Sequence, residues 1–171
     1  MSAFTSILAG NLCSFIGACF TVLSAWSRDR KRIFLYQAAQ CLILAIANIF
    51  FASLSGVTTL LLCALRNCLI AWNRYSGRSC AVFVVSVAII GLLTNNRGLV
   101  GLIPVVTTAV YTVGCYYVKS TLTIKLNLIV NFVLWTIYDL VICDYVSAAA
   151  DSVSAVTALA SLMRIRKTDS P

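Results

Sequence analysis

The chain has 171 residues, of which 61% are hydrophobic and only 11% are charged, and its formal net charge is +8. A soluble domain carries roughly 25% charged residues, and a mean hydropathy of +0.96 leaves too little polar surface to coat a soluble globule. The composition therefore excludes an ordinary soluble protein and indicates an integral membrane protein. The basic residues flank apolar stretches and form no separate basic domain, so the charge does not indicate nucleic-acid binding.

Seven apolar stretches follow one another along the chain. A helix needs about 20 residues to cross the apolar core of a bilayer. Seven spans of that length use nearly the whole sequence and leave no soluble domain. The predicted spans are residues 4–25, 33–53, 57–72, 80–93, 99–118, 121–142 and 146–163.

Lys and Arg gather in every second gap between these spans. Cytoplasmic loops retain Lys and Arg, so this alternation predicts an N-terminus outside and a cytoplasmic C-terminus. Lys125 begins the sixth span and can snorkel to the cytoplasmic side, Arg97 alone lies on the opposite side, and Arg66 lies within the third span. A re-entrant fourth span would put the later charges on the wrong side. The ten residues on the predicted cytoplasmic side are Arg28, Arg30, Lys31, Arg32, Arg74, Arg78, Lys119, Arg164, Arg166 and Lys167.

The layout of the first three spans recurs in the last three. The tight outer turns near Ser55 and Tyr145 are 90 residues apart, and Arg74 and Arg164 share that offset. With one linking span between them, both units have the same orientation, as in transporters with parallel repeats. The predicted fold is an all-α membrane protein in a 3+1+3 arrangement. Residues 1–75 and 98–171 form the two parallel three-helix bundles, and residues 76–97 form the linker helix.

The eight cysteines lie almost entirely within apolar stretches and form no C-x-x-C pair. The chain also has no histidine. We therefore interpret the cysteines as small packing residues and expect neither a metal site nor a cofactor.

Three ionisable residues fall inside the spans, where they are costly and usually face protein or water. Asp139 and Asp151 are each six residues from Tyr145, which places both about 9 Å below the outer turn by helical rise. They either share a water-filled cavity or cap and pair locally near the interface. Arg66 lies about two turns from the cytoplasmic end of its span. It either snorkels to the inner headgroups or holds an anionic group or a carboxylate between the bundles.

Uncharged polar residues form a stripe on one face of the sixth span, with a weaker counterpart on the second. Such faces line a pore or make interhelical hydrogen bonds, which are common in membrane bundles. The stripe comprises Asn127, Asn131, Trp135 and Tyr138, and its counterpart comprises Gln37, Gln40, Cys41, Ala45 and Asn48. In the pore interpretation, one polar cavity binds a solute through Arg66, Asn131, Trp135, Tyr138, Asp139 and Asp151.

Several short segments, taken in their order and spacing, resemble the YgjV family of bacterial inner-membrane proteins. They are Ser27-Arg28-Asp29-Arg30-Lys31-Arg32, Ala64-Leu65-Arg66, Leu102-Ile103-Pro104, and Trp135-Thr136-Ile137-Tyr138 leading to Asp151. The resemblance implies a relation to the SWEET, semiSWEET and PQ-loop transporters of small solutes, and a place in the bacterial inner membrane. Pro104 is the only proline within a span and no Pro-Gln dipeptide occurs, which argues against proline-hinged alternating access in the first bundle.

These observations favour a transporter of a small, sugar-like solute that moves through a cavity between the two bundles. Two aspartates are too few for the acid–base constellation of an enzyme, so no enzymatic activity is expected. The expected partners are membrane lipid and a small polar solute, with a homo-oligomer left open. The alternative is a scaffold or assembly protein that transports nothing and is packed dry where a transporter would be hydrated.

Overall fold

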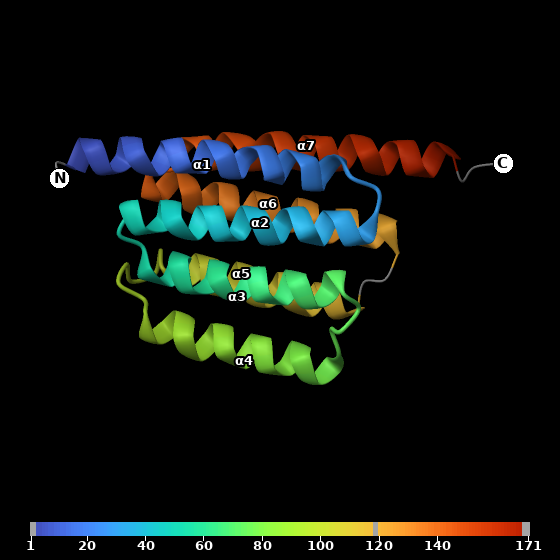
Figure 1. The fold of residues 1–171 in the computed structure, drawn as a ribbon, viewed down its shortest axis with the longest axis horizontal. Coiled ribbons are helices and arrows are strands. Elements are labelled where there is room, and N and C mark those ends of the chain that lie inside the picture. Colours follow the sequence, from blue (N-terminus) through green and yellow to red (C-terminus); the bar gives the residue numbers. More distant parts are fainter. Residues whose placement is uncertain (1–2, 118–119, 169–171) are drawn as a thin grey trace.

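The computed structural model describes residues 3–117 and 120–168, and these residues form seven α-helices and no strands. The odd number of helices places the two termini at opposite ends of the bundle (Figure 1). This arrangement confirms the predicted all-α, seven-helix fold of a membrane protein. The helices are α1 (Ala3–Trp26), α2 (Arg30–Phe50), α3 (Leu54–Ala71), α4 (Gly77–Leu93), α5 (Leu102–Tyr117), α6 (Thr121–Ile142) and α7 (Tyr145–Thr168).

Five of the helices are long and apolar enough to cross a membrane, and α4 and α5 are shorter apolar helices of 17 and 16 residues. At 1.5 Å per residue the two shorter helices span about 26 and 24 Å, compared with about 30 Å for the hydrocarbon core of a bilayer. The bilayer would therefore thin slightly beside them, or their polar flanks would reach to the interface.

Six helices close into a flattened ring. Helix α2 packs between α1 and α3, and α6 packs between α5 and α7. Contacts of α1 with α7 and of α3 with α5 join these two sets of three helices into a ring. Figure 1 shows α1, α2 and α3 in front of α7, α6 and α5. Helix α4 packs on the outside, against α3 and α5. The ring therefore encloses a space between the facing helices α2 and α6.

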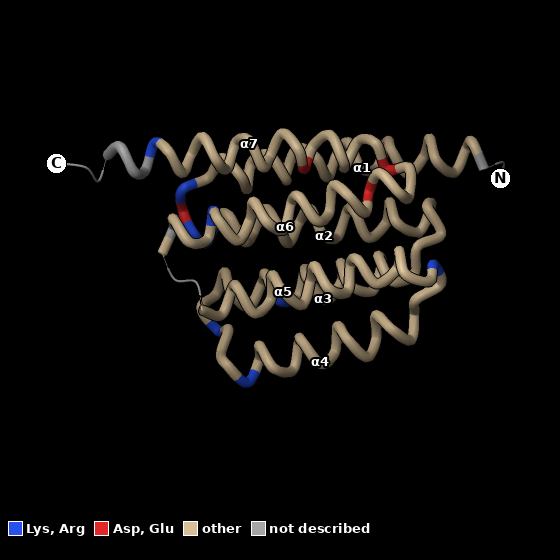
Figure 2. The backbone as a smooth tube through the Cα atoms, turned by 180° about the vertical axis from the view of Figure 1, so that it is seen from behind, with Lys and Arg blue, Asp and Glu red and all other residues tan. Residues whose placement is uncertain are grey.

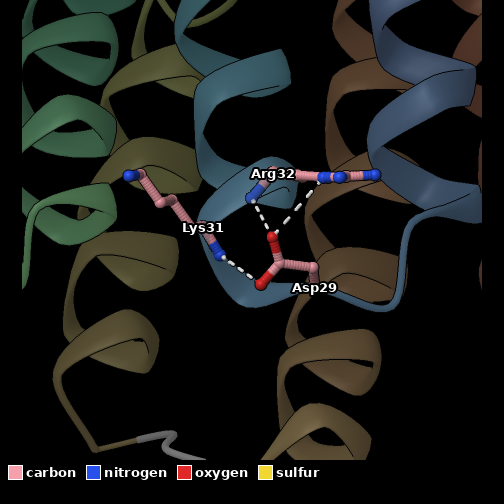
Figure 3. A network of polar contacts seen from close by, with 3 residues as sticks. All are labelled: Asp29, Lys31 and Arg32. Carbon is pink, nitrogen blue, oxygen red and sulfur yellow. Dashed lines mark hydrogen bonds and ion pairs between the residues drawn. The ribbon is translucent and has the colours of Figure 1, made fainter.

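The first turn of α2 begins earlier than the apolar pattern predicts. The Asp29 carboxylate accepts hydrogen bonds from the backbone N–H groups of Lys31 and Arg32, both at 3.3 Å, and the Arg32 Nε lies 3.8 Å from Asp29 Oδ2 (Figure 3). Asp at the N-cap satisfies free N–H groups and suits the positive end of the helix dipole. Helix α2 therefore starts at Arg30 and not at residue 33, and α7 likewise continues past the predicted end at residue 163.

Most Lys and Arg residues of the described chain lie at the end of the bundle where the C-terminus lies (Figure 2). This is the segregation that the sequence predicts. Lys119 and the side chains of Arg166 and Lys167 lie outside the described residues.

Two basic side chains bind the carboxyl ends of helices. The Lys125 ammonium, on a fully buried side chain of α6, donates to the carbonyls of Ala25 and, at 2.8 Å, Ser27, at the end of α1. Arg97 donates to the Phe51 carbonyl, at the end of α2. The last carbonyls of a helix lack intrahelical partners and carry partial negative charge. Both cations therefore hold helix ends, and Lys125, which the sequence allowed to snorkel to the cytoplasmic side, binds protein carbonyls at the end of α1.

Candidate functional site

A small polar cavity lies at the centre of the ring, with a volume of about 40 Å³. Most of the lining residues are polar, and Leu44, Leu60 and Phe132 contribute apolar wall. One water needs about 10–15 Å³ on this measure, so the cavity has room for a few waters. Its polar lining residues are Gln37, Gln40 and Asn48 on α2; Arg66 and Asn67 on α3; Tyr111 on α5; Asn131 and Asp139 on α6; and Ser147 and Asp151 on α7.

Five of the six residues predicted to form a binding site line this cavity, and Tyr138 does not. The Tyr138 side chain is fully buried beside Ala47 and Phe51, and its hydroxyl is hydrogen-bonded to Ser53 at the turn between α2 and α3. Its ring packs edge-on against Trp135, with centroids 5.5 Å apart. Tyr138 therefore packs against the Trp135 indole without lining the cavity itself. The five lining residues are Arg66, Asn131, Trp135, Asp139 and Asp151, whose role in binding stays a prediction.

The polar stripe of α6 is divided between three environments. Its middle, Asn131 and Trp135, faces the cavity. Asn127 instead meets α5, where its amide donates to the Tyr111 carbonyl at 3.4 Å. This approach is close because Gly114 has no side chain, and a Cβ there would lie 2.3 Å from Asn127 Oδ1. The pore interpretation and the interhelical interpretation thus each describe part of the same stripe.

The weaker stripe of α2 also faces the cavity, except for Ala45, which packs in the apolar cluster around Leu60. Sequence reasoning missed Asn67, Tyr111 and Ser147. For Tyr111 a signal was present. Four residues of the fifth span follow the i, i+3, i+4, i+7 spacing of a single helical face, and all four are buried: Thr108, Tyr111, Thr112 and Cys115.

Arg66 is held by neutral groups. Its guanidinium donates to Thr112 Oγ1 at 2.7 Å and to Asn67 Oδ1 at 3.0 and 3.2 Å, and it lies over the Tyr111 ring at 4.8 Å from the centroid. Only 2% of the residue is exposed, so it does not snorkel to the headgroups.

No carboxylate contacts Arg66 directly within the described part of the chain, and whether it holds an anionic group or a bridged carboxylate stays a prediction. Depth explains the lack of a direct contact. Arg66 lies twelve residues into α3, about 18 Å along the axis, whereas Asp151 lies six residues into α7, about 9 Å. The guanidinium and the carboxylates therefore occupy different levels of one cavity.

Asp139 of α6 and Asp151 of α7 both line the cavity. They are only 4% and 5% exposed, and within the described part of the chain neither accepts a hydrogen bond or joins an ion pair. The alternative interpretation, local capping or pairing near the interface, does not apply, since both carboxylates face the cavity.

The local cap at the α6–α7 turn is formed by a third aspartate, Asp144. Its carboxylate accepts from the Ser14 hydroxyl at 2.7 Å and from the Ser147 backbone N–H at 3.1 Å. Burial raises the pKa of the Asp144 carboxyl, and the hydrogen bonds from Ser14 and Ser147 oppose that rise. Asn11 also bonds this turn, donating to the Cys143 carbonyl and accepting from the Val146 N–H. The first helix is thereby fixed to the last one beside the cavity.

A family model described as a bacterial inner membrane protein, Imp-YgjV, matches residues 8–169. The chain belongs to the Imp-YgjV family. The match covers all seven helices, so the polar cavity lies wholly within the family domain. It also agrees with the apolar helices in assigning the chain to the bacterial inner membrane. Comparison with curated proteins and with solved structures gives no significant match.

Proposed function

We propose that this Imp-YgjV protein moves a small polar solute across the inner membrane, through the space between α2 and α6. The observation that carries the proposal is the central cavity, in which four helices of the ring direct amide, carboxylate and guanidinium groups away from lipid. Polar groups are costly inside a membrane protein and generally mark solute or ion pathways. The relation to the SWEET, semiSWEET and PQ-loop transporters that the YgjV resemblance implies is in the same class of function, and that relation stays a prediction.

The lining offers free hydrogen-bonding groups and one aromatic face. Gln37 is bonded to the Tyr111 hydroxyl at 3.0 Å. Gln40 and Asn131, by contrast, make no hydrogen bond within the described chain. Their amides are free to bond the hydroxyls of a solute, and the half-buried Trp135 ring supplies a stacking surface. This combination suits a sugar-like molecule.

The cavity is closed to such a solute in the conformation described. Its 40 Å³ is far below the roughly 300–1,000 Å³ of a typical ligand pocket. Helices α2 and α6 meet through side chains, with Phe34 of α2 in one cluster with Leu128 and Phe132 of α6. Transport therefore requires these side-chain contacts to separate, first towards one side of the membrane and then towards the other.

Two asparagines one turn apart on α6 provide a matched test. Asn131 faces the cavity and Asn127 faces α5. A panel of sugars and other small polar solutes is first screened for thermal stabilisation of the purified protein, and the hits are then assayed for flux in proteoliposomes. We expect Asn131→Ala to abolish stabilisation and flux. Asn127→Ala should lower stability by about 1 kcal/mol and keep both responses. Equal loss in the two variants would contradict solute binding at Asn131.

The scaffold alternative draws on a separate observation, which is the small volume of the cavity together with the hydrogen bond that fixes α1 to the α6–α7 turn. A scaffold gains rigidity from such a core and needs no opening. An empty solute screen, together with a partner that co-purifies stoichiometrically in mild detergent, would favour it over transport.

A further inference from the structure

Within the described chain, no positive group contacts either of the two cavity aspartates. Asp139 and Asp151 are at least nine-tenths buried, and no donor or cation among the described residues contacts their carboxylates. A buried charge without a partner is strongly unfavourable, and a second carboxylate in the same cavity adds to that cost. Something absent from the protein side chains must therefore offset them.

The side chains that line the cavity carry one more negative charge than positive charge when both aspartates are ionised. Arg66 is always protonated in proteins, so with both carboxylates ionised the cavity carries a net charge of −1. Asp144 is not counted in this net charge because it lies outside the cavity lining. Its carboxylate already accepts hydrogen bonds from the Ser14 hydroxyl and from the backbone N–H of Ser147 at the N-terminus of α7. One proton or one monovalent cation would make the cavity neutral.

Unpaired oxygen atoms point to a site that is built for such an occupant. The Ser147 side chain is 3% exposed, and its Oγ has no hydrogen-bond partner. It lies one turn before Asp151 on α7 and lines the same cavity. Asn48 also lines the cavity, but its unpaired Oδ1 packs against Gly56 of α3, where an added Cβ would lie 2.1 Å away. A buried polar atom is rarely left without a partner, so the Ser147 oxygen, beside two unpartnered carboxylates, indicates a missing ligand.

We propose that Asp139, Asp151 and Ser147 form a binding site for a single small positive charge, either a proton or a monovalent cation such as Na⁺. All the available ligand atoms are oxygens, which suit hard cations. No cluster of three or more His, Cys, Asp or Glu side chains occurs in the described chain, which argues against a transition metal. The volume of 40 Å³ admits an ion with a few waters. The site does not depend on solute transport.

The protonation of this site is influenced by every ionisable group around it. Cys41 on α2 and Cys63 on α3 interact with each other and with Arg66, and Asp144 at the turn interacts with both carboxylates. A bound proton can therefore be assigned to Asp139 and Asp151 only by comparing variants of these residues with the wild type, and not from the pH response of the wild type alone. The ionisable groups that line the cavity with the pair are Cys41, Cys63, Arg66 and Tyr111, and Tyr138 and Asp144 lie nearby outside the lining.

Two measurements on the full-length protein in detergent separate the two occupants. In the first, NaCl replaces choline chloride at constant ionic strength while thermal unfolding is followed. In the second, infrared difference spectra detect the carbonyl stretch of a protonated carboxylic acid at neutral pH. A Na⁺-dependent rise in the unfolding midpoint that is lost in Asp151→Asn and Asp139→Asn identifies a metal cation. A carbonyl band lost in the same variants identifies a proton. The absence of both signals in the wild type would overturn the proposal.

Matched controls make the assignment specific. Asp29→Asn changes an exposed acid and keeps its capping oxygen, so it should leave both signals intact. Ser147→Ala should weaken the Na⁺ response and spare a proton band, because a proton needs no third oxygen. If the aspartate variants do not fold, a weaker Na⁺ response in Ser147→Ala still tests whether Na⁺ binds at this site. An unchanged Na⁺ response in Ser147→Ala and Asp151→Asn would place the ion elsewhere and contradict the site. A cation signal with an empty solute screen would refute solute transport alone.

Discussion

Arg66 shows how a membrane protein accommodates a charge without an opposite charge. A bidentate contact with Asn67, a hydroxyl from Thr112 and the face of Tyr111 surround the guanidinium. The sequence allowed its depth to be predicted, because position along a helix sets depth. Its partners could not be predicted, because they depend on which faces of α3 and α5 meet. Asp139 and Asp151 illustrate the same limit, since the spacing placed both near the α6–α7 turn whereas their lack of partners could not be predicted.

We expect Arg66→Met to reduce stability. The substitution leaves the buried Asn67 Oδ1 without its donors, at a cost of about 1–3 kcal/mol. Thermal unfolding in detergent measures the effect. Arg32→Met removes an Arg side chain that is 73% exposed, and it should stay within about 0.5 kcal/mol of wild type. If Arg66→Met unfolds at the wild-type midpoint while solute flux falls, Arg66 serves the solute and not the fold.

At the scale of the helices, the apolar pattern predicts every span, while side-chain caps set the ends. Asp29 extends α2 by one turn into a basic segment that the hydropathy pattern reads as a loop. Close helix contacts depend on glycines, as in many membrane bundles. On α1, a Cβ at Gly17 would lie 2.8 Å from the Leu44 side chain of α2. These contacts could not be predicted from hydropathy, because a glycine facing lipid gives the same signal.

Replacing Gly17 should therefore disturb both packing and the cavity, because Leu44 lines the cavity wall. We expect Gly17→Leu to lower stability by about 1–3 kcal/mol through overpacking of α1 against α2. Cys19→Leu places the same side chain at an exposed position of the same helix and should be tolerated. Thermal unfolding of the two variants is compared. Equal midpoints would show that α1 and α2 do not approach as closely as described.

At the scale of the whole molecule, the contacts have the order that a twofold repeat requires. A rotation that brings α1 to α5, α2 to α6 and α3 to α7 also exchanges the two closing contacts, α1–α7 and α3–α5. This supports the parallel 3+1+3 repeat, whose superposition stays a prediction. Helix α4 breaks the symmetry, because it packs only beside α3 and α5. The sequence predicted the number and order of helices, but only packing reveals that the two units form one ring around a shared cavity.

Orientation in the membrane is the remaining property on which access to this cavity depends. Most of the described Lys and Arg lie at the C-terminal end of the bundle, and the one exception among the loops, Arg97, caps α2. Since cytoplasmic loops retain basic residues, we predict a cytoplasmic C-terminus and an external N-terminus. A C-terminal green fluorescent protein fusion should fluoresce, and a C-terminal alkaline phosphatase fusion should be inactive. The reverse pattern would contradict the prediction.

With the predicted orientation, Asp139 and Asp151 lie nearer the periplasmic side than Arg66 does, so a cation would enter the cavity from the periplasm.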